Sequence, residues 1–421
     1  MEIATKRSLA SSKVAPKLMF TLACLYFVQG IPIGLTFYGI PALLRTTGVA
    51  LEQIAMVQIV GLFWALKCFW SSVVENHWSA KLGKRRSWIL PMQLVIVVTI
   101  MLLSSVEVSA TNLPIIAAIL ACMSFAGATQ DIATDAFAAE NSHTESLGVT
   151  NTIQMSGVLI GLMVAGPLST GLFEHLGYQV TCWILAALVL VAMLPITLWR
   201  ESASKGHVSH SASLKKFFAT PNSTPVLVMC SLATINGVII LAIIKFVLID
   251  RGWSLSDVGL VTGIGHLMSM LLGCLLGGIV ISYLTFKRAL SIGLSGVISG
   301  GLIWFSITQS SELPVHLVWI ATFVVGVSMG LVAVAVYTYS MRFSKSSNQP
   351  GINISVFQST QTFGEIVFSS IATSIAGVLG YGSAFIAGAM IGFACLIALY
   401  LCYCYRGFAV NTKQPLSAEP L

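Results

Sequence analysis

The feature that most constrains this chain is a recurring stretch of about 20 or more apolar residues, separated by short polar breaks. A helix needs about 20 apolar residues to cross the hydrocarbon core of a bilayer. Within lipid a helix satisfies its own backbone hydrogen bonds, so stretches of this length predict helices. Twelve spans are expected, at residues 18–44, 53–75, 88–108, 113–139, 147–173, 178–199, 224–249, 255–284, 288–308, 314–341, 352–377 and 381–404.

The composition agrees with an all-α membrane protein. Hydrophobic residues make up 56% of the 421 residues and charged residues only 9%, whereas soluble domains carry about 25% charged residues. The net charge of +7 therefore does not indicate a nucleic-acid partner. The one basic tract, Lys84-Arg85-Arg86, is interpreted as a membrane-flanking anchor.

The basic residues orient the chain in the membrane. With the N-terminus in the cytoplasm and twelve alternating spans, eighteen of the 22 Lys and Arg residues fall on the cytoplasmic side. Only Arg45 and Arg251 fall outside, and Lys67 and Lys245 lie within spans. This positive-inside bias predicts a multi-pass protein with both termini in the cytoplasm.

The two halves of the sequence are related by a shift of 204 residues. GVALEQIAMVQIVG (48–61) aligns with GWSLSDVGLVTGIG (252–265), and the same shift places Gln154 on Gln358. Two parallel six-helix halves with a binding site between them near the midplane are typical of the major-facilitator fold. We expect an N-terminal half at 1–199, a cytoplasmic linker at 200–223, and a C-terminal half with a short tail at 224–421.

Ionisable residues within a span are costly and are therefore candidates for function. Asp131 and Asp135 lie four residues apart, on one helix face. Two close carboxylates repel each other when both are ionised, so the pair can hold a proton, which suits proton coupling. Alternatively, Asp135 lies close enough to the cytoplasmic end to be a structural residue. Lys67 either pairs with Asp131 or meets an anionic substrate.

Several amides extend this candidate site. Gln358, Gln361 and Glu365 form one polar stripe on the eleventh span, which either binds polar substrate groups or packs against another helix. Gln29 lies beside Gly30 and Pro32, where the first span can kink. Two further amides complete the predicted substrate and proton pathway: Gln130 and Gln154.

The sequence favours neither an enzyme nor a metal or cofactor site. It contains no GxxxxGK[ST], HExxH or GxSxG motif. His207 and His210 lie in the polar break, where solvation is the preferred interpretation over metal binding. A sensor is disfavoured because no loop is long enough to form an appended soluble domain.

Several motifs resemble one branch of the major facilitator superfamily, which includes AmpG muropeptide permeases, acetyl-CoA transporters and siderophore permeases of the RhtX/FptX type. These motifs are QGIPIGL (29–35), KCFWSS (67–72), GKRRSW (83–88), TQDIATDAF (129–137), RGWSLSDVGLV (251–261) and FKRAL (286–290).

The resemblance implies roles for individual residues. Glu75, Lys84, Arg85 and Arg86 match a superfamily loop whose acid–base contacts brace the second and third spans at the cytoplasmic gate. Lys67, Gln130, Asp131 and Asp135 match intramembrane polar positions of this branch.

The sequence departs from the muropeptide permeases in two features that bear on the substrate. Muropeptide permeases of this type are commonly longer and tend to carry a basic residue in the fifth span, which here has none. The compact form is more similar to the siderophore permeases. The resemblance thus implies a monomeric secondary transporter that imports a siderophore, or a similar bulky polar metabolite, with protons across a bacterial inner membrane. The alternatives are a muropeptide permease and a drug or metabolite exporter.

Overall fold

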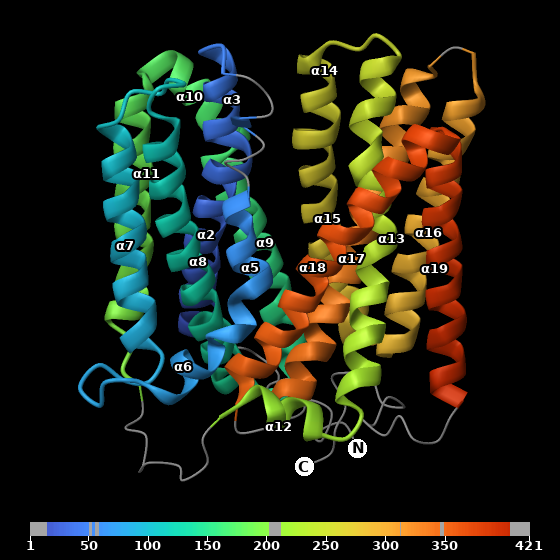
Figure 1. Cartoon of the computed structure of the whole chain (residues 1–421). Helices are drawn as coiled ribbons and strands as arrows, with labels where there is room; N and C mark the ends of the chain where they lie inside the picture. Colours follow the sequence, from blue (N-terminus) through green and yellow to red (C-terminus); the bar gives the residue numbers. More distant parts are fainter. Residues whose placement is uncertain are drawn as a thin grey trace.

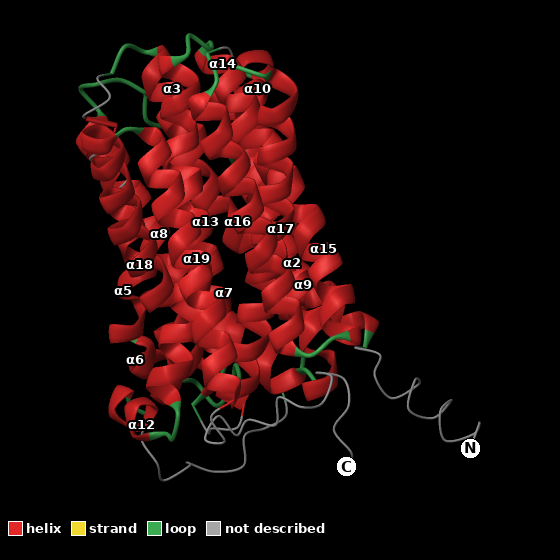
Figure 2. Ribbon diagram, turned by 90° about the vertical axis from the view of Figure 1, so that its right-hand side faces the viewer, coloured by secondary structure: helices red, strands yellow, loops and turns green. Residues whose placement is uncertain are grey.

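The computed structural model describes residues 15–49, 53–54, 59–201, 212–311, 313–345 and 349–404. In these residues the regular structure is helical, and the long helices run side by side with loops at both ends of the bundle (Figure 2). Eleven of the described helices are long and apolar enough to cross a membrane. The predicted all-α membrane fold is therefore confirmed.

The helices form two groups that lie side by side (Figure 1). The first, the N-terminal group, contains α2 (Pro16–Gly34), η1 (Leu35–Gly39), α3 (Ile40–Thr46), η2 (Ile59–Gly61), α5 (Leu62–Leu66), η3 (Lys67–Phe69), α6 (Ser71–Asn76), α7 (Arg86–Ser104), α8 (Leu113–Asn141), η4 (Thr144–Ser146), α9 (Leu147–Ala165), α10 (Pro167–Leu176) and α11 (Tyr178–Thr197).

The C-terminal group follows the short helix α12 (Leu214–Ala219). It contains α13 (Ser223–Asp250), α14 (Leu255–Gly259), η5 (Leu260–Gly265), α15 (His266–Tyr283), α16 (Phe286–Gln309), α17 (Val315–Lys345), α18 (Pro350–Leu379) and α19 (Tyr381–Cys404). Residues 202–211 of the predicted linker, which include His207 and His210, lie outside the described residues, so the domain boundaries stay a prediction.

The second predicted span, 53–75, is not one continuous helix in the residues described. It consists of short helical pieces, and it tightens to a 3₁₀ turn at Lys67–Phe69. The backbone N–H of Cys68 donates to the hydroxyl of Ser359 on α18 at 3.2 Å. An interaction with another helix thus takes the place of an internal helical bond, which explains the break.

Three other spans also differ from a single regular helix. The fifth breaks at Gly166, because Pro167 has no N–H to continue the ladder and begins α10. The first and the eighth each contain a π-helical segment, Leu35–Gly39 and Leu260–Gly265. Such segments are rare in proteins overall, and those that occur are often found at functional sites.

Matched glycines support the internal repeat. Gly48 and Gly252, which the sequence shift pairs, have φ of 85° and 82°. Gly177 and Gly380, each followed by a tyrosine that begins the last helix of its group, have φ of 83° and 84°. A left-handed backbone at equivalent turns is a position that favours glycine. The two groups therefore share turn geometry as well as sequence.

Glycines bring the backbones of α2 and α9 into contact. A Cβ on Gly161 would lie 2.0 Å from the carbonyl oxygen of Phe27, and a Cβ on Gly30 would lie 2.2 Å from that of Val158. Small residues allow such close approach between membrane helices. The packing of α2 on α9 therefore depends on these two positions.

Gly161→Ala is expected to separate α2 from α9 and to cost at least the roughly 1–3 kcal/mol typical of overpacking. The thermal stability of purified protein in detergent measures this cost. Gly171→Ala is the matched control, because a Cβ there meets nothing within 4 Å. Equal stability of the two variants would contradict the proposed packing.

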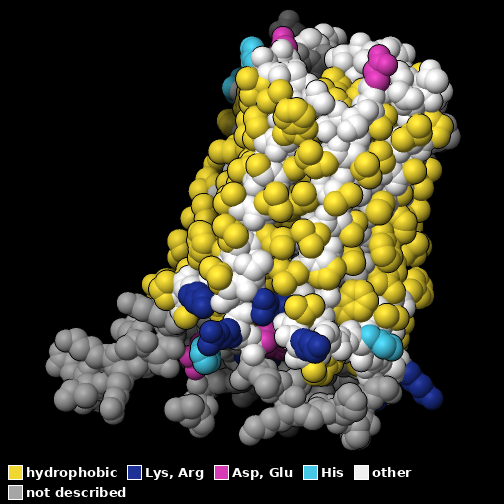
Figure 3. Space-filling view, turned by 90° about the vertical axis from the view of Figure 1, so that its left-hand side faces the viewer, with side chains coloured by type: hydrophobic (Ala, Val, Ile, Leu, Met, Phe, Trp, Pro, Cys, Tyr) yellow, Lys and Arg dark blue, Asp and Glu magenta, His cyan; other side chains and the backbone are white. Residues whose placement is uncertain are grey.

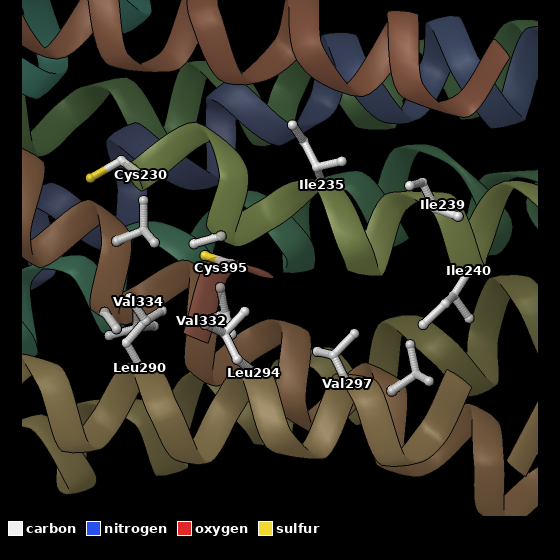
Figure 4. Packing of buried hydrophobic residues seen from close by; sticks show 14 of the residues in the cluster. Cys230, Ile235, Ile239, Ile240, Leu290, Leu294, Val297, Val332, Val334 and Cys395 are labelled. Atoms are coloured by element: carbon white, nitrogen blue, oxygen red, sulfur yellow. The ribbon is translucent and has the colours of Figure 1, made fainter. Parts of the chain in front are cut away.

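The apolar side chains divide between the interior and the outer belt. Inside the C-terminal group, apolar side chains from α13, α16 and α17 belong to one buried cluster, and Figure 4 shows Leu294 of α16 beside Val332 of α17. On the outside, apolar side chains cover one face of the bundle along most of its length (Figure 3). Lys and Arg side chains gather at one end of that face, and we call this end, which holds Lys84, Arg85 and α12, the basic end.

Candidate functional site

A buried cluster joins the two groups of helices, and we call it the charge clasp: Lys67, Asp131, Asp135 and Gln358. The side chain of Lys67 is 1% exposed and forms an ion pair with Asp131 of α8. The same ammonium donates to the Oε1 of Gln358, which belongs to α18 in the other group. Lys67 is thus paired with Asp131 in this structure, and it also forms a contact between the groups.

Asp135 accepts hydrogen bonds from three side chains. Tyr26 and Gln154 donate to its Oδ1, each at 2.9 Å, and Gln358 donates to its Oδ2 at 2.7 Å. Gln154 and Gln358 are the two glutamines that the sequence shift pairs. One amide from each half therefore meets a single carboxylate.

One carboxylate oxygen of Asp131 accepts no hydrogen bond from the described residues. Its Oδ1 is buried and has no hydrogen-bond partner among the described residues, while its Oδ2 binds Lys67. The neighbouring Gln130 donates to the backbone carbonyl of Leu25 at 3.3 Å and thus braces α8 against α2. Gln29 is buried on α2, and its Oε1 lacks a partner among the described residues.

The predicted polar stripe on α18 divides between two places. Gln358 belongs to the charge clasp, whereas Gln361 and Glu365 line a cavity inside the C-terminal group. Lys245, which the sequence places within a span, is exposed, and its ammonium lies 5.0 Å from the centroid of the Phe246 ring.

A second cluster, the basic-end cluster, consists of Glu75, Lys84, Arg85 and Glu140. The guanidinium of Arg85 donates to both oxygens of Glu75, at 2.8 and 2.9 Å, and to both oxygens of Glu140, at 2.5 and 2.9 Å. Lys84 donates to Glu75 at 2.6 Å. Two-point contacts between arginine and carboxylate fix geometry as well as charge.

The side chain of Arg86 has a different partner from that of Arg85, although the backbone N–H groups of both residues donate to Glu201. The Arg86 side chain donates to the carbonyl of Thr197 at the end of α11. On the other side of the cluster, a Cβ on Gly351 would lie 2.6 Å from Oε2 of Glu75. Glycine thus lets the first turn of α18 approach a carboxylate, which a helix N-terminus favours.

The charges of the basic-end cluster hold one another ionised. Burial alone would raise the pKa of Glu75, but Arg85 and Lys84 lower it to about 2 from an ordinary 4.5. Burial alone would lower the pKa of Arg85, but Glu75 and Glu140 raise it above its ordinary value. Glu75 follows the apolar helix Ile59–Phe69 and lies at the basic end.

We expect this cluster to make stability depend on acid pH. A lowered folded-state pKa stabilises the protein above the ordinary pKa, and the stabilisation is lost as the pH falls through the folded-state value. For Glu75 this window runs from about 4.5 down to about 2. Melting temperatures at pH 6 and pH 3 should differ more for the wild type than for Glu75→Gln. An equal difference would contradict the ion-pair assignment.

Further contacts between the groups occur towards the basic end. The side-chain amide of Asn76 forms two hydrogen bonds with the backbone of Ala212, each 2.9 Å. Gln349 does the same with Ser213, at 2.9 and 3.0 Å. Since these amides come from opposite groups, the segment before α12 connects them at the basic end.

Three residues that belong to these clusters or contact them were not predicted from the sequence: Tyr26, Glu140 and Glu201. A buried tyrosine one turn from Gln29 gave no distinguishing signal. Glu140 and Glu201 did give a signal in the sequence, because Glu140 ends the fourth span and Glu201 follows the sixth, both on the side of the basic loop. In the part of the chain that the structure describes, no three His, Cys, Asp or Glu side chains are grouped to hold a metal ion.

Two helical groups joined by a buried clasp of charges define a multi-pass membrane protein of the transporter class. The chain belongs to the Major Facilitator Superfamily, whose pattern it matches over residues 22–367.

Two known proteins are similar to this chain in sequence. The chain is 28% identical over 298 residues to the anhydromuropeptide permease of Escherichia coli K12, covering 68% of this chain and 60% of the permease. It thus spans less than two thirds of that relative's length. It is also 26% identical over 408 residues to an uncharacterized protein of Haemophilus influenzae, covering 90% of both chains.

Solved structures confirm the fold. The fucose:proton symporter FucP of E. coli has a TM-score of 0.71 at 14% identity, covering 92% of this chain and 99% of FucP. A bacterial homologue of the iron transporter ferroportin, in an outward-facing state, has a TM-score of 0.70 at 12% identity, covering 93% and 100%. At such identities the likeness shows the fold alone.

Proposed function

We propose that this protein is a proton-coupled permease for an anhydromuropeptide or a closely similar bulky polar metabolite. The charge clasp carries the proposal, because a buried lysine and two carboxylates are costly within a bilayer and mark a pathway for protons or substrate. The named permease among the relatives supplies the substrate class.

We infer that the basic end faces the cytoplasm of a bacterial cell and that the protein lies in the inner membrane. The excess of Lys and Arg on that side supports this orientation. The hydrogen bonds of Asn76 and Gln349 to the segment before α12 then close the cytoplasmic side. The state described would receive its substrate from the other side.

Proton coupling would act through Asp131. A proton on this carboxyl removes its charge and frees the ammonium of Lys67, which weakens the bond of Lys67 to Gln358 across the groups. An anionic group of the substrate can then take the place of Asp131 as the partner of Lys67. A proton or substrate drives the change of state only by binding the two states differently.

The test is uptake of a radiolabelled anhydromuropeptide into proteoliposomes with and without an imposed pH gradient. Uptake that a protonophore abolishes is the expected result. The import of a siderophore, which the sequence favoured, has no support among the relatives, and radio-iron siderophores form the comparison arm. Uptake of siderophores alone would contradict the proposed substrate, and uptake indifferent to the gradient would contradict the coupling.

A further inference from the structure

The C-terminal group contains a cavity of about 210 Å³, which we call the C-half cavity. Helices α13, α15, α16, α17 and α18 line it, and Met155, Val158 and Leu159 of α9 contribute from the other group. Most of its wall is apolar, and Val297 and Val332 of this wall are drawn in Figure 4. The cavity is smaller than the roughly 300–1,000 Å³ of pockets that enclose a whole drug-sized ligand, so it can hold one end of a larger solute.

Among the described residues that line this cavity, Glu365 of α18 is the one acid. Its side chain is partly exposed, and its carboxylate oxygens do not belong to the fully buried polar atoms, unlike the Nε2 of Gln361. In the part of the chain that the structure describes, no side chain or backbone group donates a hydrogen bond to this carboxylate or forms an ion pair with it. The carboxylate therefore keeps accessible surface and a free acceptor where the residue borders the cavity.

No basic side chain is positioned to neutralise Glu365. The described lining of the cavity includes no Lys, Arg or His. Lys67 is already paired within the charge clasp, and Lys245 of α13 is exposed with its ammonium over an aromatic ring. Both ring nitrogens of His266 on α15 are buried without a described partner, so they do not contact the carboxylate. The other Lys and Arg residues of the lining helices lie at the start of α16 and the end of α17, at the basic end.

An ionised carboxylate without a counter-ion is costly within a bilayer, so we expect its counter-ion to arrive with a ligand. The rest of the lining favours an organic cation over a metal ion. Tyr337 of α17 lines the same cavity and interacts electrostatically with Glu365. A phenol ring attracts a cation that lies over its face within about 6 Å. Met270 and Met329 add adaptable apolar surface. Calcium and magnesium ions, by contrast, need about six or more oxygen ligands. This chemistry suits an ammonium group on an apolar stem.

We propose that Glu365 and Tyr337 form a cation subsite that binds the ammonium group of the solute. The sequence left open whether the polar stripe on α18 binds substrate or packs against another helix, and for Glu365 the subsite takes the first alternative. This inference rests on the proposed function for the anionic contact at Lys67, and it adds a second charged contact to the same pathway.

The subsite lies on the same face of α18 as the charge clasp. Glu365 follows Gln358 by two helical turns, which is about 10 Å along the helix axis, and Gln358 contacts Lys67. A solute with its anionic group at Lys67 and its ammonium group at Glu365 thus carries opposite charges roughly 10 Å apart. An extended chain of about three amino acids spans this distance. The pathway therefore selects a zwitterionic solute, and a solute with either charge alone binds less tightly.

The decisive variant is Glu365→Gln, which removes the charge and keeps the shape of the side chain. Neutralising a carboxylate that has no partner in the fold leaves no charge unpaired, so the melting temperature of the purified variant should equal or exceed that of the wild type. A large fall would show that the carboxylate has a partner in the fold, which contradicts the subsite. Glu174→Gln is the matched control, because Glu174 is exposed on α10 and does not line the cavity.

Binding is measured first with a small cation. n-Butylammonium chloride should raise the melting temperature of the wild type and of Glu174→Gln more than sodium chloride at the same ionic strength. Glu365→Gln should bind butylammonium about tenfold or more weakly, the effect of losing a hydrogen bond between charged groups. Glu365→Asp, which keeps the charge, should retain part of the shift. Equal shifts with butylammonium and sodium in the wild type, or an unchanged shift in Glu365→Gln, overturn the subsite.

A tripeptide separates the subsite from the proposed function. Trialanine carries both charges, whereas N-acetyl-trialanine lacks the ammonium group. Wild-type protein should bind trialanine about tenfold more tightly than the acetylated peptide, and Glu365→Gln should bind the two equally. Equal binding of both peptides by the wild type overturns the subsite, as does uptake of the anhydromuropeptide by Glu365→Gln with an unchanged KM. The expected peptide preference in a protein that transports no anhydromuropeptide supports the subsite and overturns the proposed function.

Discussion

Replacing Lys67 by methionine is expected to abolish transport and to destabilise the protein by about 3–5 kcal/mol, the cost of leaving a buried charge without its partner. Methionine keeps most of the length of the side chain and removes the ammonium. Asp131 then loses its ion pair, and Gln358 loses a donor from the other group. Both the fold and the contact between the groups are therefore affected.

Neutralising the partner separates these two effects. In the double variant Lys67→Met/Asp131→Asn no unpaired charge is buried, so the melting temperature should recover although uptake does not. Lys245→Met is the control, because Lys245 is an exposed lysine within a span. Additive losses of stability in the double variant would show that the two residues do not interact.

Replacing Arg85 by alanine is the second change with a large expected effect. Arg85 is 1% exposed and is the hydrogen-bonded counterion of both Glu75 and Glu140. Its removal leaves Glu75 buried with Lys84 alone, and we again expect a loss of about 3–5 kcal/mol. The carboxylate of Glu75 also lies against Gly351 in the first turn of α18, in the other group. Uptake should therefore fall by more than the loss of folded protein explains.

The measurement is uptake per folded molecule, with folded protein quantified by size-exclusion chromatography. Arg85→Lys keeps the charge but not the two-point geometry, so it should recover stability only in part. Arg200→Ala removes an exposed arginine and should behave like the wild type. If folded Arg85→Ala took up substrate at the wild-type rate, the result would contradict a gating role for the basic-end cluster.

Eleven of the twelve predicted spans correspond to described helices that are long and apolar enough to cross a membrane, because hydrophobic length is a property of consecutive residues. The sequence did not predict the breaks at Lys67 and at Gly166. The first arises where Ser359, almost 300 residues away, accepts a backbone hydrogen bond. Proline marks the second, but proline within a membrane span does not by itself decide between a kink and a break.

The members of the candidate site could be proposed from the sequence, but most of their contacts could not. Ionisable residues in apolar spans are conspicuous, so Lys67, Asp131 and Asp135 were candidates. The pairing of Lys67 with Asp131 was one of two alternatives, because sequence spacing does not contain the angle at which α8 is rotated against the second span. Tyr26 is an uncharged residue in an apolar helix, and only its burial and its hydrogen bond to Asp135 distinguish it.

The two glutamines on Asp135 show how the halves differ despite the repeat. At the shift of 204 residues, the C-terminal counterparts of Lys67, Asp131 and Asp135 are Leu271, Ala335 and Tyr339. Each half thus has one glutamine of the pair, while the acids and the lysine occur in the N-terminal half only. Gln154 binds Asp135 within its own half, and Gln358 binds it from the other half. Because the matching positions of the C-terminal half carry no charge, the two halves meet here without repulsion between like charges.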